Sequence, residues 1–77
     1  MMYESIIIVD KPDAEKLRDF LEGEDSELNN KRAYRRIEIE DNKLIIKIYA
    51  KDATSLRAMT NAILKALYIW EKMEVLK

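Results

Sequence analysis

The residue types that carry most protein chemistry are scarce in this sequence. Its 77 residues include no His and no Cys, so the usual general base, the thiolate nucleophile and the common transition-metal ligands are all missing. With a single Gly, the chain has no glycine-rich phosphate loop. Carboxylates, lysines and tyrosines remain as candidates for catalysis, but the acidic residues are scattered and do not converge. We therefore predict a protein that is not an enzyme and uses no cofactor or metal ion.

Apolar and polar residues alternate between positions 32 and 51, which predicts a β-hairpin around Asp41 and Asn42. If these two are the loop residues, the cross-strand pairs are Glu40–Lys43, Ile39–Leu44, Ile37–Ile46, Arg36–Lys47 and Tyr34–Tyr49. One face of this hairpin is then apolar and belongs to the core, with Ile37, Ile39, Leu44, Ile46 and Ile48. The opposite face is basic and aromatic, with Arg32, Tyr34, Arg36, Ile45, Lys47, Tyr49 and Lys51.

This basic and aromatic face has three interpretations. The first is a dimer interface around Tyr34, Ile45 and Tyr49. The second is an RNA-binding surface formed by Arg32, Arg36, Lys47 and Lys51. The third is an ordinary exposed face of a sheet. The unbroken β-branched run at positions 6–9 favours the dimer, because such runs are typical of strands covered on both faces.

A long helix is predicted from Asp52, a good N-cap, to about Val75. Its broad apolar face is assigned to the core and contains Leu56, Met59, Ile63, Ala66, Leu67, Trp70 and Met73. A separate stripe of the same helix carries Leu64, Tyr68 and Val75 with Arg57, and Asn61 lies one turn after Arg57. Because this stripe has no obvious partner within the chain, we predict that it binds a larger partner protein. The alternative is that Arg57 pairs locally with Asp52 or with carboxylates on the Glu71 side of the helix and only keeps the helix soluble.

The remaining patterns complete a β-α-β-β-α order. A first strand is predicted over residues 3–9, and a short helix then begins near Pro12 and ends before Gly23. The apolar face of this helix contains Ala14, Leu17, Phe20 and Leu21. A polar loop over residues 24–31 follows. We predict an α+β fold in one domain over residues 1–77, a three-stranded antiparallel sheet with two helices on one face.

Size and composition favour association with another chain. A domain of this length buries only about 60–65% of the surface that its unfolded chain exposes, so its stability alone is marginal. Disulfides cannot supply the missing stability, because the chain has no Cys. A content of 48% apolar residues beside 38% charged residues favours an oligomer. The net charge of −1 does not attract nucleic acid, so any RNA contact needs a local patch. The apolar segments are too short for a signal peptide or a membrane span, and we expect a cytoplasmic protein.

The stretch from Asn42 to Asp52, followed by Leu56-Arg57-Ala58 and by Asn61 to Lys65, resembles the Pcc family, the small subunit of the archaeal KEOPS complex. The shared features are a strand ending in Ala and Asp and a helix that opens with Leu-Arg-Ala and an Asn. Length, element order and the opening strand before Pro12 also agree. The resemblance therefore covers nearly the whole chain.

The resemblance implies a homodimer that bridges two copies of the large threonylcarbamoyltransferase subunit, in a complex that modifies the adenosine next to the tRNA anticodon. The family's small subunit has no catalytic residues and helps to form the assembly and its tRNA surface. Other interpretations are a stand-alone K-homology-like RNA-binding domain, a transcription-associated factor, or a dimerisation appendix like that of GMP synthetases. K-homology domains use a Gly-x-x-Gly loop, and the single Gly of this chain argues against them.

Overall fold

The structure, a computed structural model, describes residues 1–10, 13–23 and 32–75. Its elements are β1 (Tyr3–Asp10), α1 (Ala14–Gly23), β2 (Ala33–Glu40), β3 (Lys43–Ala50) and α2 (Ala53–Val75). The predicted β-α-β-β-α order is confirmed, and β1 extends one residue beyond its predicted end. Pro12 and the polar loop expected over 24–31 lie outside the described residues.

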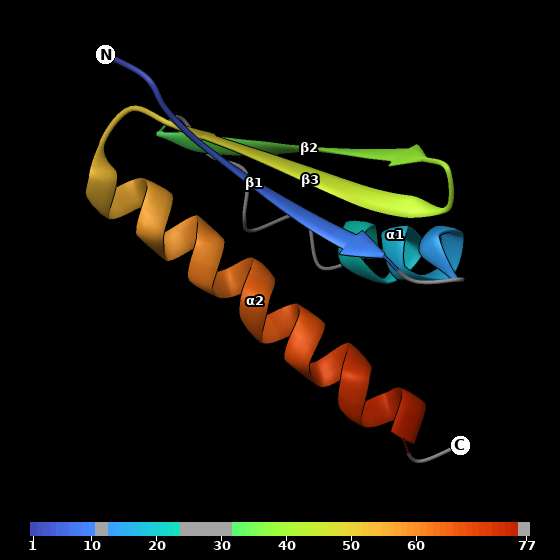
Figure 1. Cartoon of the computed structure of the whole chain (residues 1–77). Helices are drawn as coiled ribbons and strands as arrows, with labels where there is room; N and C mark the ends of the chain where they lie inside the picture. The colour runs from blue at the N-terminus through green and yellow to red at the C-terminus, as the bar shows by residue number, and fades with distance from the viewer. Residues whose placement is uncertain (11–12, 24–31, 76–77) are drawn as a thin grey trace.

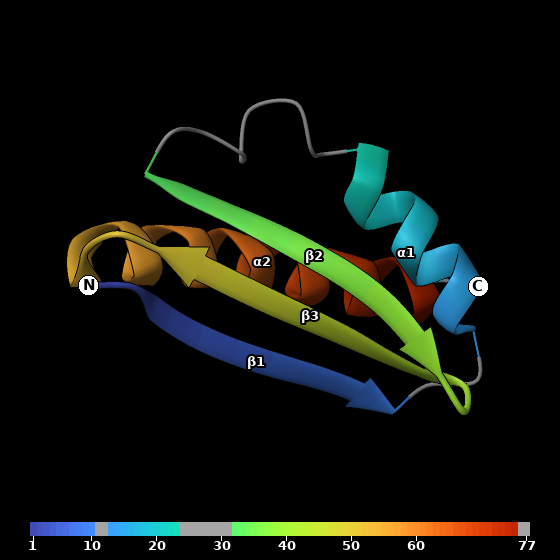
Figure 2. The ribbon, with the colours of Figure 1, turned by 90° about the horizontal axis from the view of Figure 1, so that it is seen from above.

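The three strands form one antiparallel sheet in the order β1-β3-β2, so β3 is central and β1 and β2 are the edges. Both helices lie against the same face of this sheet, as Figure 1 shows. Seen from above in Figure 2, no element of the described chain covers the other face. The predicted α+β architecture is therefore confirmed. We call the two sides the covered face and the open face.

A two-residue turn joins β2 to β3 and sets the register of the hairpin. Asp41 and Asn42 both have positive φ angles, 52° and 64°, which is the geometry of a type I′ turn. Short Asx side chains tolerate this left-handed region better than β-branched ones do. The resulting register pairs Glu40 with Lys43 and Tyr34 with Tyr49, and all five predicted cross-strand pairs are confirmed.

The core lies between the covered face and the two helices. Its buried residues are Ala14, Leu17, Leu21, Ala33, Leu44, Ile46, Ile48, Ala50, Met59, Ile63 and Ala66. Full burial of one such aliphatic side chain stabilises the fold by about 1.5–3 kcal/mol. The rings of Phe20 and Trp70 meet with centroids 5.4 Å apart and join α1 to α2. Met73 was predicted in this core, but it is 44% exposed.

A buried arginine, which the sequence analysis did not single out, fixes the end of α1. Arg35 shares the covered face of β2 with Ala33 and Ile37, since all three have the same parity along the strand. Its guanidinium is buried, and Nη2 donates a 2.6 Å hydrogen bond to the carbonyl of Leu21. The last carbonyls of a helix have no partner within the helix, so Arg35 ties the end of α1 to the sheet.

The start of α2 is capped as predicted. Asp52 Oδ1 accepts a 2.7 Å hydrogen bond from the backbone N–H of Ser55, the standard N-cap contact. This bond lowers the pKa of Asp52, and the charge of Arg32 adds to the effect. Arg32 forms an ion pair with Asp52 at 3.6 Å.

No described helix has the length and apolarity needed to cross a membrane.

Candidate protein-binding surfaces

The open face combines residues from all three strands. From one end of the sheet to the other, its rows are Glu4–Tyr49–Tyr34, Ile6–Lys47–Arg36, Ile8–Ile45–Glu38 and Asp10–Lys43–Glu40. The predicted dimer residues Tyr34 and Tyr49 stack on each other with ring centroids 5.0 Å apart. Ile45 lies two rows away from this stack and is half-buried. The structure thus brings the tyrosines together at one end of the face and puts Ile45 nearer its centre.

The charge of the open face is mixed and not basic as the hairpin alone had indicated. Lys47 Nζ lies 3.2 Å from Glu38 Oε2, and this hydrogen-bonded carboxylate raises the pKa of Lys47. Together with the Arg32–Asp52 pair, two of the four predicted RNA-binding cations have carboxylate partners. The strand rows also bring acidic side chains of β1 and β2 onto this face: Glu4, Asp10, Glu38 and Glu40. Arg36 and Lys51 are exposed.

The β-branched run of β1 is covered on one side only. Ile7 and Val9 pack against the core, whereas Ile6 and Ile8 are 53% and 60% exposed on the open face. The expectation of a strand covered on both faces is therefore not met within one chain, because both helices lie on the same side. The sequence run was a usable signal for this exposed surface, although Ile6 and Ile8 were not singled out as binding residues.

The predicted stripe of α2 lies on the surface. Leu64 and Tyr68 are 49% and 59% exposed, and Arg57 and Asn61 are exposed beside them. At 100° per residue these side chains fall on one flank of the helix, next to that of Thr60. The Thr60 hydroxyl lies 3.2 Å from the hydroxyl of Ser5, which places this flank on the β1 side of the molecule. We call Arg57, Asn61, Leu64 and Tyr68 the α2 stripe.

Two residues of the α2 stripe, Tyr68 and Arg57, were candidates for contacts with charged neighbours. Lys72 Nζ lies over the ring of Tyr68, 5.3 Å from its centroid, a partly exposed cation–π contact. The alternative interpretation expected Arg57 to pair with Asp52. In the structure, Asp52 forms an ion pair with Arg32. The apolar surface of Leu64 and Tyr68 therefore remains in contact with solvent in the single chain.

The comparison with protein-family models identifies this arrangement of strands and helices. Residues 5–73 match the family described as "Transcription factor Pcc1", and the match overlaps every described element from β1 to α2. The chain belongs to the Pcc1 family. This family is the small-subunit family of KEOPS and a non-catalytic accessory family. The comparison with curated proteins found no match.

A second apolar flank of this Pcc1-family chain was missed from the sequence. Ile69 and Met73 are both more than 40% exposed on the side of α2 opposite to the stripe. The spacing of Met73 had assigned it to the broad core face. It is exposed where α2 runs obliquely away from the sheet toward its C-terminal end, as Figure 1 shows. Met73 follows Ile69 by four residues, and this spacing could have indicated from the sequence that both lie on the same side of the helix.

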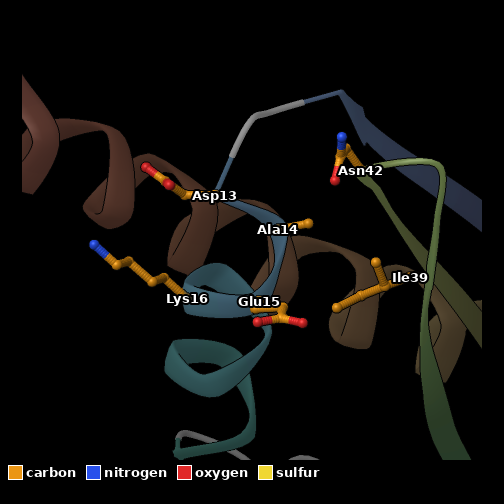
Figure 3. A pocket seen from close by; sticks show the side chains of 6 residues that line it. All are labelled: Asp13, Ala14, Glu15, Lys16, Ile39 and Asn42. Atoms are coloured by element: carbon orange, nitrogen blue, oxygen red, sulfur yellow. The ribbon is translucent and has the colours of Figure 1, made fainter.

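A hollow of about 390 Å³ lies between the start of α1 and the hairpin turn. Its lining residues are Asp13, Ala14, Glu15, Lys16, Ile39 and Asn42. Figure 3 shows that Asp13 and Lys16 point away from Ile39 and do not converge on a common point. Within residues 1–10, 13–23 and 32–75, no group of acidic side chains is arranged to hold a metal ion. The open face and the flanks of α2 carry the exposed apolar side chains Ile6, Ile8, Leu64, Tyr68, Ile69 and Met73.

Proposed function

We propose that this Pcc1-family chain is a dimerising, non-catalytic assembly subunit of a KEOPS-type complex that forms threonylcarbamoyladenosine in tRNA. The observation that carries the proposal is the exposed apolar pair Leu64 and Tyr68 on a well-formed helix. An enzyme would bring polar groups together in a cleft, whereas this chain presents apolar side chains on a convex helix. Such side chains are suited to contact with another protein.

The α2 stripe is the proposed contact with the threonylcarbamoyltransferase subunit. Leu64 and Tyr68 would form the desolvated centre of the contact, since large apolar and aromatic side chains dominate the energy of interfaces. Arg57 and Asn61 would lie at its polar rim. Each copy of the chain carries one stripe, so a homodimer has two and can bridge two transferase subunits. This bridging is the role proposed for the subunit.

Self-association is the second part of the proposal. The covered face is filled by α1 and α2, but the open face exposes Ile6 and Ile8 to water. A domain of this size gains stability by burying such surface in a dimer. Tyr34, Ile45 and Tyr49 remain the sequence-based prediction for the interface of that dimer.

Contact with tRNA is a weaker, supporting role in this proposal. Arg36 and Lys51 are exposed cations near the Tyr34–Tyr49 stack, and Lys47 and Arg32 would have to share or leave their carboxylates to bind phosphate. The isolated subunit should therefore bind tRNA weakly, and the complete complex more tightly. Because tRNA is the substrate of such a complex, we place the subunit in the cytoplasm, with archaea as the source that the resemblance implies.

Native mass spectrometry of the subunit mixed with its transferase partner tests the proposed function. The expected species contains two copies of this chain and two of the transferase. A species with one copy of each would contradict the bridging role and leave the contact intact. Absence of any joint species, with both proteins folded, would contradict the assembly function itself.

A further inference from the structure

Three successive rows on the open face of the hairpin pair side chains of the same kind. They run in the order cation pair, aromatic pair, cation pair: Arg32–Lys51, Tyr34–Tyr49 and Arg36–Lys47. Successive rows on one face lie about 7 Å apart, since each strand residue rises by about 3.4 Å. The stacked tyrosines therefore have a pair of cations on either side of them along the hairpin. We call these six residues the tyrosine patch.

The cation pairs are unfavourable in the isolated chain. Like charges directly opposite each other destabilise a sheet, and Arg36 with Lys47 has this arrangement. The nitrogen of Lys47 lies 3.2 Å from a carboxylate oxygen of Glu38. A nitrogen of Arg32 lies 3.6 Å from a carboxylate oxygen of Asp52. Both ion pairs are partly exposed to water and compensate the repulsion only weakly, so a bound anion would remove a cost that the chain carries alone.

Tyr34 has a ring face that the described chain leaves open. Its ring stacks on that of Tyr49 with 22° between the ring planes, which occupies one face. Because β2 is an edge strand, no described strand lies beside Tyr34 on its other side, and Tyr34 is 44% exposed. At the far end of the same row, Glu4 of β1 lies beside Tyr49 and would repel a phosphate. The patch is therefore open to a base at Tyr34 and to phosphates at the cations.

We propose that the tyrosine patch binds an unpaired nucleotide of single-stranded RNA, with the base stacked on the outer face of Tyr34 and the neighbouring phosphates held by the two cation pairs. This inference deepens the tRNA contact of the proposed function and rests on it for the identity of the RNA. The nucleotide must be unpaired, because bases inside a duplex stack on each other and have no free face. Aromatic side chains beside cations are the usual components of single-strand sites.

The other end of the open face limits the length of the site. The rows beyond the patch carry three carboxylates and one cation: Asp10, Glu38, Glu40 and Lys43. Negative side chains there repel the phosphates of a longer RNA segment. The site is therefore short, and we expect the isolated chain, with its net charge of −1, to bind RNA weakly and at low ionic strength.

A second copy of the chain is a poorer occupant of the patch than RNA. A two-fold interface brings the same surface of both copies together, so the cations of one patch would meet those of the other. Burial of the Lys47–Glu38 ion pair would add a desolvation cost. The inference therefore assigns Tyr34 and Tyr49 to RNA in place of the dimer interface predicted from the sequence.

Fluorescence anisotropy with a labelled single-stranded oligoribonucleotide measures the binding of the full chain, and the same strand annealed to its complement measures duplex binding. Tyr34→Leu removes the ring, whereas Tyr34→Phe keeps it. We expect Tyr34→Leu to raise the Kd by about 5- to 150-fold, the range that loss of one base stack gives, and Tyr34→Phe to bind as the natural chain does. Tyr3→Leu is the matched control, because Tyr3 is 37% exposed but has the parity of the covered face.

Salt dependence separates the base stack from the phosphate contacts. Tyr34→Leu removes no charge, so it should shift log affinity equally at every salt concentration. Arg36→Ala should reduce the slope of log affinity against log salt by about 0.7 per chain, the value for one phosphate of a single strand. A Tyr34→Leu variant that folds and binds as the natural chain does would overturn the inference. A duplex that binds as tightly as the single strand would overturn it as well.

Nuclear magnetic resonance of the natural chain tests the stack without any substitution. Saturation with the single-stranded RNA should shift the ring protons of Tyr34 and Tyr49 and leave those of Tyr3 in place. Unmoved Tyr34 resonances would overturn the stack, and shifts that appear without RNA as the protein concentration rises would mean that a second copy occupies the patch. If the joint species with the transferase forms while Tyr34 does not respond to RNA, the inference fails and the proposed function stands. If Tyr34 binds RNA but no joint species forms, the proposed function fails and the site remains.

Discussion

Substitution of Leu64 by Asp is the most direct test of the α2 stripe. Leu64 is 49% exposed in the single chain, so about half of its side chain is still available for burial against a partner. Asp is also an acceptable residue on the exposed surface of a helix. The variant should therefore fold and lose only the proposed contact.

The magnitude follows from two contributions. Full burial of a Leu side chain is worth about 1.5–3 kcal/mol, so burial of the exposed half contributes about 1 kcal/mol to binding. An unpaired carboxylate in the centre of the interface adds a desolvation cost of at least about 2 kcal/mol. The sum of about 3 kcal/mol corresponds to a Kd raised by about two orders of magnitude. The stability of the chain itself should change by less than about 1 kcal/mol, as for most surface substitutions.

Isothermal titration calorimetry with the purified transferase subunit measures the Kd, and a thermal melt measures the stability of each variant. Ala58→Asp is the matched control, because Ala58 is exposed on α2 away from the stripe. We expect it to bind as the natural chain does. A Kd for Leu64→Asp within threefold of that control would refute the stripe as the partner contact. Ile69 and Met73, together with Phe20, which contacts Trp70 of the same helix, would then define the next surface to test.

Three further predictions concern charge and the buried arginine. Replacing Arg36 and Lys47 with Ala should lower the tRNA affinity of the assembled complex and reduce the slope of log affinity against log salt by about two to four units per dimer. The pKa of Asp52 in the folded chain lies below its ordinary value of 3.8. Ionised Asp52 therefore stabilises the fold above pH 3.8, and this stabilisation is lost as the pH falls through the folded pKa. Asp52→Asn should reduce the difference between the melting temperatures measured at pH 6 and at pH 3. Arg35→Ala should destabilise the chain by about 2–3 kcal/mol in urea unfolding, since the carbonyl of Leu21 loses its charged donor.

Each of these predictions has a contradicting result. An unchanged salt slope would mean that the cations of the open face do not touch phosphate. A melting temperature of Asp52→Asn that falls as steeply with acid as that of the natural chain would mean that other carboxylates cause the acid sensitivity. Arg35→Ala with unchanged stability would mean that water replaces the guanidinium at the end of α1.

The parts of the fold that follow from local patterns were predictable from the sequence. Alternation with a period of two identified the hairpin, and the Asp41-Asn42 turn determined its register because turn geometry depends on neighbouring residues alone. Helical spacing and the Asp52 cap identified α2, and the exposed positions of Leu64 and Tyr68 followed from their angle around the helix. The resemblance to the Pcc family rested on the same segments and is confirmed by the family match.

Only the tertiary structure decided which strands are neighbours and what their side chains meet. Placing β1 beside β3 added Glu4, Asp10 and two exposed isoleucines to the open face, which already carried Glu38 and Glu40 of β2. Strand order depends on contacts between residues far apart in the sequence, which local periodicity does not encode. Arg35 is a second example. Its parity along β2 placed it on the covered face, but its hydrogen bond to the carbonyl of Leu21 depends on the packing of α1 against that face. The sequence therefore determined the elements and their faces, and the packing of β1 and the two helices decided which of those faces remain open to a partner.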